Sequence, residues 1–522
     1  MKAVLLAAAA AICLASGAHA QGTTLTVMNS VEAAHHDPAR TSAGSMPMYM
    51  FGDTLVALDY DLKTIKPLLA KSWTISEDGK TYTFQLRDDV TFCSGKKFTA
   101  ADVVYTVNRV VDKETKSPFT WRMGKVKELR AKGDFTVEYE LEEPFSELLQ
   151  NLTVFQATIV NEENVKALGR DFGVKGIDGT GPFCFTSWEP RNQMTLTRRP
   201  EYKWGPDFYQ NRGPAKFEKI VFKIVPEEAA RLAAMASGQV DVTTTMPDQY
   251  LPQVSKMPNL QVLRPAAEQR TFYLGFKTSR ENLQDVRVRT ALNLAVERKP
   301  IADQVYFGNA EPAATFIHPK TPGFSAGIPL HLGKYDPVEA GKILDEAGWK
   351  MGSDNFRYKD GKKLTLQLYG FAGGRSPKVA EAVQGSWRKI GVDLQIQMWD
   401  GTIVFSKLAQ QDYDLWSIAY PYASVGDAAL LYFHSKNIPT PNRMNWKDKE
   451  TDDWLDAGSA ALTEKEKDEN FTKVMKKVHE AAVWVPIVHE GVVLVASKRL
   501  KNLRAHNPYP SYLLYKALDV SP

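Results

Sequence analysis

Few side chains of this 522-residue sequence combine the types and the spacing that catalysis requires. The glycine-rich run Gly179-Thr180-Gly181-Pro182 has the composition of a phosphate-binding loop, but neither a basic residue nor a helix start follows it. We therefore interpret the run as a tight turn before a strand. The sequence contains no G-x-S-x-G, H-E-x-x-H, Walker or C-x-x-C motif, so we expect neither an enzyme nor a protein with a cofactor.

The residues His35-His36-Asp37 carry the side chains of a metal site. Adjacent residues on an extended segment point to opposite faces, however, so the two imidazoles do not converge on one ion. We interpret these residues, and also His434 and His489, as structural, and we expect no metal site.

The N-terminus has the features of a secretory signal peptide. A short basic start precedes the apolar stretch Ala3 to Leu14, and Ala18-His19-Ala20 forms an A-x-A cleavage site before Gln21. Isoleucine precedes Cys13 where a lipid-attachment site needs a small residue, which argues against a lipoprotein. No later run reaches the roughly 18 apolar residues of a membrane helix. We expect cleavage after Ala20, a soluble periplasmic protein, and a mature N-terminus at Gln21.

Two cysteines, Cys93 and Cys184, remain after this cleavage. In an oxidising compartment they form either one bridge or two buried thiols. Both lie in predicted strands, and we predict the bridge.

Composition is that of an ordinary large globular protein, with 43% hydrophobic and 24% charged residues. The chain is too long for one hydrophobic core, so two or three domains are expected. Its net charge of +4 falls by one, to +3, when Lys2 leaves with the signal peptide. This charge is too weak to indicate binding to nucleic acid or to an anionic membrane.

Strand and helix patterns alternate along the chain, which indicates a mixed α/β fold. The first half combines alternating strands with a helix that ends at Gly238, and a second α/β unit follows Arg270. In this unit Asp336-Pro337 begins a helix, and residues 363–399 read as strand, helix, strand. The final stretch, 483–500, is rich in strand residues again.

Several longer segments carry a family resemblance. The first is KFTAADVVYTVNR, in which Thr99 caps a helix and Asp102 lies in its first turn. This segment is Lys97 to Arg109, and the others along the chain are Leu69 to Phe92, Gly179 to Phe183, Ala236 to Val242, Asp285 to Ala310 and Asp336 to Lys350. Together they resemble family 5 of the extracytoplasmic solute-binding proteins, the peptide-, oligopeptide- and nickel-binding type that serves ABC importers.

The resemblance implies a two-lobed periplasmic-binding-protein fold of mixed α+β type, cluster C, with an extra subdomain in lobe one and a two-strand hinge. Its crossings between the lobes fall near Ala266 to Phe276 and near Val485 to Val493. The implied parts are a signal peptide (1–20), lobe one (21–270), lobe two (271–484) and a return to lobe one (485–522).

A ligand pocket between the lobes is also implied. Peptide-binding members hold the amino terminus of the ligand with an aspartate that follows an aromatic residue. Here Tyr420 takes the aromatic position and Ala423 the aspartate position. A buried ammonium without a carboxylate is costly, so we expect ordinary peptides to bind poorly unless Asp427 substitutes. The further pocket residues that the resemblance implies are Glu32, Ala33, Trp121, Arg270, Tyr273, Trp399, Ser417 and Tyr422.

The resemblance implies a monomeric receptor that captures a small solute and delivers it to an inner-membrane ABC permease of two transmembrane subunits with cytoplasmic ATPases. Aromatic walls with few fixed charges suit a peptide, a modified peptide, an opine or a sugar conjugate. Two alternatives are a carrier of a nickel complex or of haem with the same fold, and a secreted hydrolase.

Overall fold

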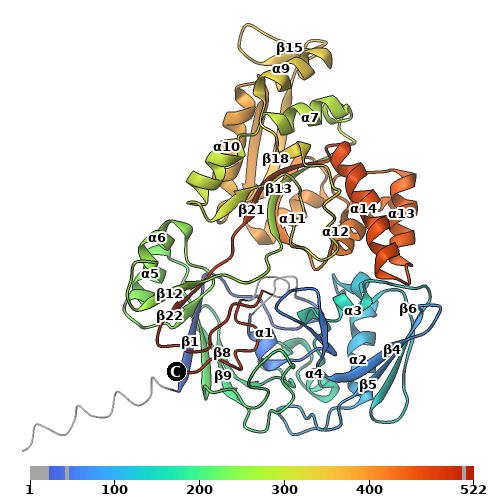
Figure 1. The fold of residues 1–522 in the computed structure, drawn as a ribbon, viewed down its shortest axis with the longest axis vertical. Coiled ribbons are helices and arrows are strands. Elements are labelled where there is room, and N and C mark those ends of the chain that lie inside the picture. Colours follow the sequence, from blue (N-terminus) through green and yellow to red (C-terminus); the bar gives the residue numbers. More distant parts are fainter. Residues whose placement is uncertain (1–22, 42–45, 508–512) are drawn as a thin grey trace, which may run out of the picture.

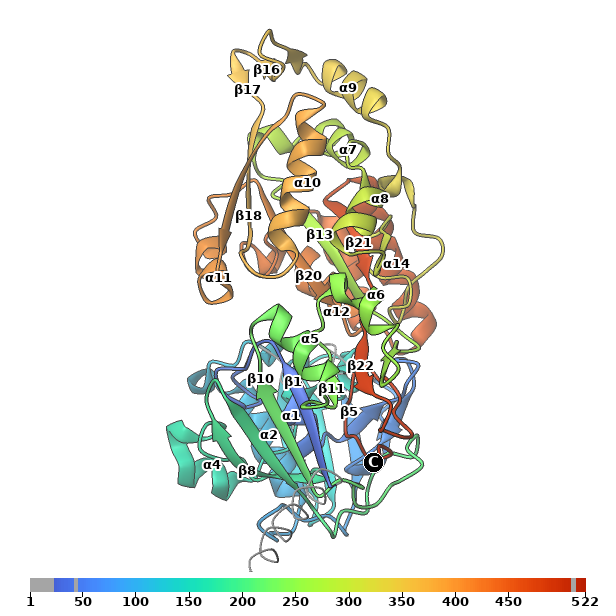
Figure 2. The same ribbon diagram turned by 90° about the vertical axis from the view of Figure 1, so that its left-hand side faces the viewer.

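The structure is a computed structural model that describes residues 23–41, 46–507 and 513–522. The predicted signal peptide and its cleavage site lie outside these residues. The described chain forms two mixed α/β lobes that lie one above the other along the long axis (Figures 1 and 2). The predicted two-lobed fold is confirmed. No helix among the described residues is long and apolar enough to span a membrane.

Lobe one is built on a seven-stranded sheet that contains both the first and the last strand of the described chain. Its order is β12 (Leu260–Leu263), β22 (Leu494–Ser497), β11 (Val242–Thr243), β1 (Thr24–Asn29), β10 (Lys219–Ile224), β9 (Gln193–Arg198) and β8 (Phe183–Glu189). Its other elements are α1 (Met46–Phe51), β2 (Val56–Leu58), β3 (Ile65–Pro67), α3 (Leu148–Asn151), α4 (Glu162–Leu168), α5 (Glu228–Ala236) and α6 (Leu251–Val254).

The extra subdomain of lobe one is a four-stranded sheet covered by helix α2 (Ala100–Val111). The sheet order is β4 (Ala70–Ile75), β5 (Thr81–Leu86), β7 (Thr136–Leu141) and β6 (Val126–Ala131). The predicted helix start is present, because the backbone N–H of Thr99 donates to the Asp102 carboxylate over 2.9 Å. At the other end of α2, Arg109 pairs with Asp37 over 2.8 Å and ties the helix to the segment after β1.

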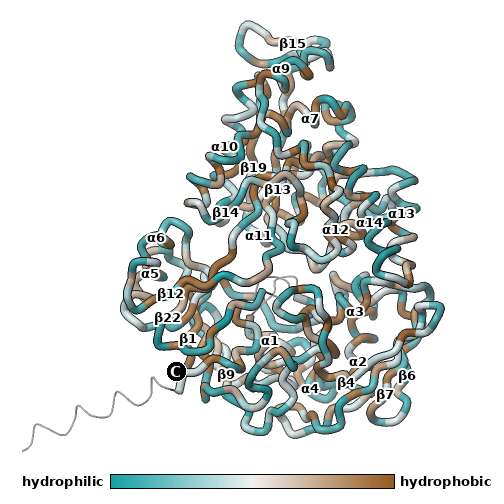
Figure 3. The backbone as a smooth tube through the Cα atoms, in the orientation of Figure 1, coloured by the Kyte–Doolittle hydropathy of each residue, from teal (hydrophilic) through white to brown (hydrophobic). Residues whose placement is uncertain are grey.

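Lobe two is built on a six-stranded sheet. Its order is β14 (Ala310–Pro312), β21 (Trp484–Glu490), β13 (Arg270–Phe276), β20 (Leu415–Pro421), β18 (Thr365–Phe371) and β19 (Asp393–Trp399). The helices are α7 (Val286–Leu294), α8 (Arg298–Pro300), α9 (Pro337–Glu346), α10 (Ser376–Arg388), α11 (Gly401–Ala409), α12 (Val425–Phe433), α13 (Lys449–Ser459) and α14 (Glu464–Glu480). A small sheet of β15 (Lys350–Met351), β16 (Arg357–Lys359) and β17 (Lys362–Lys363) lies beyond α9. Separate hydrophobic cores fill the two lobes, and Figure 3 shows hydrophobic stretches along inner strands such as β13 and β22.

Two segments connect the lobes. The chain enters lobe two between β12 and β13, and it returns between β21 and β22. Strands β13 and β21 pair antiparallel within the second sheet, so the two crossings lie side by side. The predicted return point, residue 485, falls inside β21, which stays paired in the second sheet as far as Glu490. The sheet therefore places the return after Glu490.

The glycine-rich run 179–182 is a packing element. It lies against the end of α1, where a Cβ on Gly179 would come within 1.9 Å of the Phe51 carbonyl oxygen. A Cβ on Gly181 would come within 2.3 Å of the Met50 carbonyl oxygen. Only glycine permits this close approach of two backbones, which agrees with a turn rather than a phosphate site.

The predicted disulfide joins Cys93 to Cys184 across 91 residues. It connects the loop before α2 to the edge strand β8. Replacing both cysteines with alanine should lower the free energy of unfolding by about 2 to 4 kcal/mol, because a long loop is released in the unfolded chain. Urea unfolding of the double variant measures this difference, and an unchanged midpoint would contradict it.

Candidate functional site

A cavity of about 590 Å³ lies between the two lobes, beside the crossing strands. Lobe one contributes the loops after β1 and β11 and the start of α5, and lobe two contributes the turn before α10 and the strands β13 and β20. The lining residues are Ser30, Glu228, Arg231, Thr244, Thr245, Met246, Pro247, Asp248, Gln249, Arg270, Phe272, Val305, Phe371, Gly373, Gly374, Arg375, Ser376, Lys378, Phe405, Ile418, Ala419 and Glu490. Both lobes enclose the cavity, so a solute inside it would contact both.

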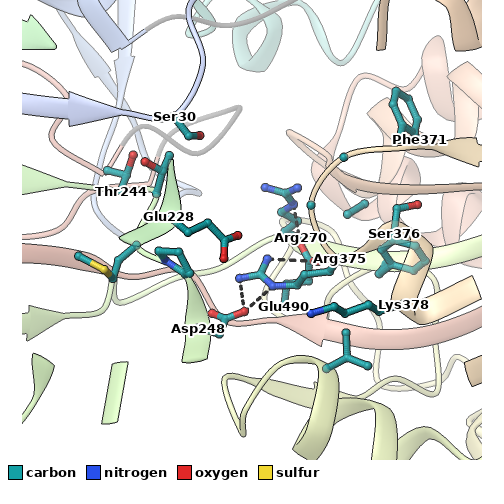
Figure 4. A pocket seen from close by; sticks show the side chains of 18 of the residues that line it. Ser30, Glu228, Thr244, Asp248, Arg270, Phe371, Arg375, Ser376, Lys378 and Glu490 are labelled. Atoms are coloured by element: carbon teal, nitrogen blue, oxygen red, sulfur yellow. Dashed lines mark hydrogen bonds and ion pairs between the residues drawn. The ribbon is translucent and has the colours of Figure 1, made fainter. Parts of the chain in front are cut away.

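A chain of four charges crosses the cavity from one lobe to the other (Figure 4). Asp248 of lobe one pairs with Arg375 of lobe two, and an Arg375 nitrogen lies 3.8 Å from the Glu490 carboxylate. Glu490 in turn pairs with Arg270 over 2.6 Å. These ion pairs therefore link lobe one to lobe two, and they lie where both crossing strands end.

Two neutral side chains donate hydrogen bonds to the two carboxylates among these four charges. The Asn309 amide donates to Asp248 over 2.9 Å, and the Tyr306 hydroxyl donates to Glu490 over 2.8 Å. Burial raises the pKa of Asp248. Burial acts in the same direction on Glu490, but the adjacent Arg270 and Arg375 outweigh it and hold the pKa of Glu490 below its ordinary value.

Local sequence explains how these side chains reach the cavity. Arg375 ends the turn Gly373-Gly374, immediately before the N-terminus of α10. Asp248 stands in the single helical turn that leads into α6. Arg270 is the first residue of β13 and Glu490 the last residue of β21, so their side chains meet where the chain crosses between lobes.

The structure brings one of the ten predicted pocket residues, Arg270, to this cavity. Tyr273 and Tyr422 are buried in the core of lobe two, where their hydroxyl groups hydrogen bond to each other. Ser417 is buried beside them on β20. Burial raises the pKa of both tyrosines well above the ordinary value.

Asp427 occupies a second contact between the lobes. Its carboxylate lies 3.2 Å from Arg122 of lobe one and accepts the backbone N–H of Ala423 over 2.9 Å. The Gln150 amide of lobe one donates to the Ala423 carbonyl over 3.1 Å. Asp427 and Arg122 are both buried, so this carboxylate is committed to an arginine. Nothing in this arrangement presents Asp427 to a ligand ammonium.

The remaining predicted residues lie apart from one another. Glu32 accepts hydrogen bonds from the Trp188 indole over 3.0 Å and from the backbone of the β8–β9 hairpin, and Ala33 is buried next to it. Trp121 borders a separate small cavity between lobe one and α12. Trp399 and Tyr420 are half-buried in lobe two. Their contact with a solute stays a prediction.

The histidine candidates have structural partners. His36 is buried against the Trp188 ring, and Asp37 is engaged by Arg109. In the part of the chain that the structure describes, no three His, Cys, Asp or Glu side chains gather in a way that could hold a metal ion.

Buried histidines near the crossing strands predict acid sensitivity. His489 accepts or donates a 2.9 Å hydrogen bond with Thr271 and packs against His318, and burial lowers the pKa of His489 to about 3 and that of His318 to about 4. A histidine held neutral in the fold stabilises it above pH 6.5 and loses that contribution as the pH falls. Each such imidazole should therefore lower the free energy of unfolding by about 1.4 kcal/mol per pH unit as the pH falls from 6 to 4.5.

The measurement is urea unfolding at pH 6 and pH 4.5 for the unmodified protein and for His489→Gln. The variant lacks one of the neutral imidazoles, so its free energy of unfolding should fall less steeply with acidification. Equal slopes for the two proteins would contradict the assignment.

Comparison with known proteins places this geometry in a family. The family model described as bacterial extracellular solute-binding proteins, family 5 Middle, matches residues 64–439. The chain belongs to the family 5 extracellular solute-binding proteins. The predicted family is thereby confirmed, and the proteins of this family are solute receptors of ABC importers rather than enzymes.

Three similar proteins are informative. The nickel-binding periplasmic protein of Escherichia coli K12 is 26% identical over 467 residues, which is 84% of each chain. The glutathione-binding protein GsiB of Escherichia coli O1:K1 / APEC is 25% identical over 465 residues, 86% of this chain and 85% of that protein. The crystal structure of NikZ from Campylobacter jejuni in complex with Ni(L-His) superposes with a TM-score of 0.82 at 21% identity, covering 96% of this chain and 100% of NikZ. These relatives share the solute-binding fold while differing in what they bind.

Proposed function

We propose that this solute-binding protein is an exported periplasmic receptor that encloses a small polar solute between its lobes and delivers it to an inner-membrane ABC importer. The cavity at the crossing strands carries this proposal, because its walls come from both lobes. A solute there would be removed from water when the lobes close, which strengthens each polar contact. The similarity to periplasmic relatives supports the location.

The proposal includes finer statements that follow from the family. The receptor acts as a monomer, its signal peptide is removed after Ala20, and its partner is a permease of two transmembrane subunits with cytoplasmic ATPases. We propose no role in binding nucleic acid. The solute is a peptide, modified peptide, opine, sugar conjugate or similar compound of a size that suits a cavity of about 590 Å³.

A nickel-complex carrier is the second candidate, because two of the similar proteins are named for nickel. The described lining of the cavity contains carboxylates, arginines and hydroxyls but no histidine or cysteine. Such a lining would hold the organic part of a complex rather than ligate the metal itself. Elemental analysis of protein purified without chelators separates the two candidates.

Lobe closure tests the proposed function. Small-angle scattering of protein stripped of solute by mild denaturation and refolding should give a larger radius of gyration than the same protein saturated with the recovered solute. Closure about the two crossings changes the separation of the lobes and leaves each lobe intact. An unchanged radius at saturation would count against a hinged receptor.

A further inference from the structure

The return crossing leaves lobe two at Gly491, directly after β21. Its backbone N–H donates to the carbonyl oxygen of Asn309, the residue before β14, over 2.9 Å. The Asn309 N–H donates to the Tyr306 carbonyl oxygen, and the Asn309 side-chain amide takes its place by donating to the Gly491 carbonyl oxygen over 2.9 Å. Asn309 thus extends the ladder between β14 and β21 by one residue and fixes the crossing where it leaves the sheet.

Gly491 is closely packed between this asparagine and the other crossing. A Cβ on Gly491 would come within 2.8 Å of the Asn309 carbonyl oxygen, 2.9 Å of its side-chain oxygen and 3.0 Å of Arg264, which follows β12 on the outgoing crossing. Because Gly491 does not have a positive φ, its backbone would accept alanine, and it is the packing that disfavours a side chain here. The two crossings and lobe two therefore meet at Gly491.

The same side-chain amide also reaches lobe one. An amide NH2 group has two N–H donors, and Asn309 also donates to the Asp248 carboxylate over 2.9 Å. Both residues are buried, with 5% of Asn309 and 4% of Asp248 exposed. Asp248 pairs in turn with Arg375 of lobe two, as Figure 4 shows. One amide group therefore connects the hinge backbone to the ion pair that joins the lobes.

Separation of the lobes would break only part of this arrangement. Asp248 belongs to lobe one, so it would leave Asn309 and Arg375 together, whereas the contacts between Asn309 and Gly491 lie at the exit of the crossing from lobe two. The closed form is thus the form in which both donors of the Asn309 amide are used. Asn309 does not line the cavity, so it would affect binding through the closed geometry rather than through contact with a solute.

We propose that Asn309 is a positioning residue that sets the closed angle of the hinge, because its amide fixes the return crossing and the interlobe carboxylate relative to each other. This inference rests on the proposed function and names a contact that holds the closed receptor. The chemistry requires an amide, since a carboxylate and a carbonyl both accept hydrogen bonds and a double donor satisfies both. An aspartate of the same shape would place lone pairs against both acceptors.

Single-molecule fluorescence transfer tests the assignment through the lifetime of the closed form. Dyes are attached to Ser187→Cys on β8 and Gln395→Cys on β19, which are exposed positions on the two lobes, while Cys93 and Cys184 are paired with each other. The probe is the heat-released extract of natively purified protein, added at a fixed dilution. In Asn309→Asp the closed lifetime should be about tenfold shorter, and the open lifetime, which reports association, should change less than about threefold.

Gly491→Ala is an independent variant, because its methyl group would enter the space of Asn309 without removing a donor. It should also shorten the closed lifetime. Asn259→Asp is the matched control, since Asn259 is exposed on lobe one, and its closed lifetime should equal that of the unmodified protein. A role confined to folding would lower the free energy of unfolding, measured with urea, without shortening the closed lifetime.

The outcomes separate this inference from the function on which it rests. Closed lifetimes of Asn309→Asp and Gly491→Ala equal to that of the unmodified protein would overturn the role of Asn309 and leave the receptor function standing. An extract that changes the transfer efficiency of no protein, the unmodified one included, would contradict closure on a solute and therefore the proposed function itself.

Discussion

Replacing Arg375 with methionine should weaken binding of the recovered solute about 100-fold. Arg375 of lobe two pairs with the buried Asp248 of lobe one and also lies near Glu490. Removing one partner of a buried pair leaves an uncompensated charge, which costs about 3 kcal/mol or more. In an open receptor water would solvate the Asp248 carboxylate, so the variant destabilises the closed form more than the open form. Because solute binding requires closure, the affinity falls by the same free energy.

Calorimetric titration measures this affinity, and Arg170→Met is a suitable control because Arg170 is exposed on lobe one, away from the cavity. Asp248→Asn should weaken binding as well, since it removes the other member of the same interlobe pair. A loss confined to Arg375→Met would assign the arginine to direct solute contact. Affinity within about threefold of the original for both variants would contradict a role in closure.

Replacing Lys516 with methionine should lower the free energy of unfolding by about 3 to 5 kcal/mol. Lys516 is fully buried in the C-terminal segment, where it pairs with Asp53 over 2.5 Å. Its ammonium also donates to the carbonyl oxygens of Tyr49 and Gly52 over 2.9 Å, at the end of α1. The variant leaves a buried carboxylate and two carbonyl groups without this cation.

Urea unfolding tests this second prediction. Lys498→Met is the matched control, because Lys498 is exposed near the same end of the chain. The double variant Lys516→Met/Asp53→Asn should recover part of the loss, since it removes the unpaired charge. Equal stability of Lys516→Met and the Lys498→Met control would contradict the prediction, because the buried Asp53 carboxylate would then not depend on the Lys516 ammonium.

Much of the fold follows from local patterns in the sequence. The stripe of valines after Thr99 predicts α2, and Asp336 begins α9 as expected, with its carboxylate accepting the Glu339 N–H over 3.0 Å. The two cysteines pair as predicted. These features depend on neighbouring residues or on the pairing of two cysteines, so they can be predicted from a single sequence.

The cavity lining is harder to predict, because it depends on tertiary packing. The resemblance favours Ser417 and Tyr420 on β20 and Tyr422 just after it, whereas Ile418 and Ala419 of this strand line the cavity. Ile418 and Ala419 are neighbours near the end of the strand and both line the cavity, so strand alternation alone does not predict which side chains face it. Asp248 and Arg375 stand in short turns that have no periodicity. The Gly-Gly-Arg-Ser run before a helix is the signal that could have indicated Arg375, and Asp248 has no such signal.

The most direct test of the interlobe cavity as the solute site is the solute content of natively purified protein when a side chain fills this cavity. Gly373 borders the cavity and has open space around its Cβ position. Gly385, within α10, has open space as well but does not line the cavity. Mass spectrometry should find bound solute in the unmodified protein and in Gly385→Trp, and little or none in Gly373→Trp. Solute retained equally by Gly373→Trp would place the binding site elsewhere and contradict the account.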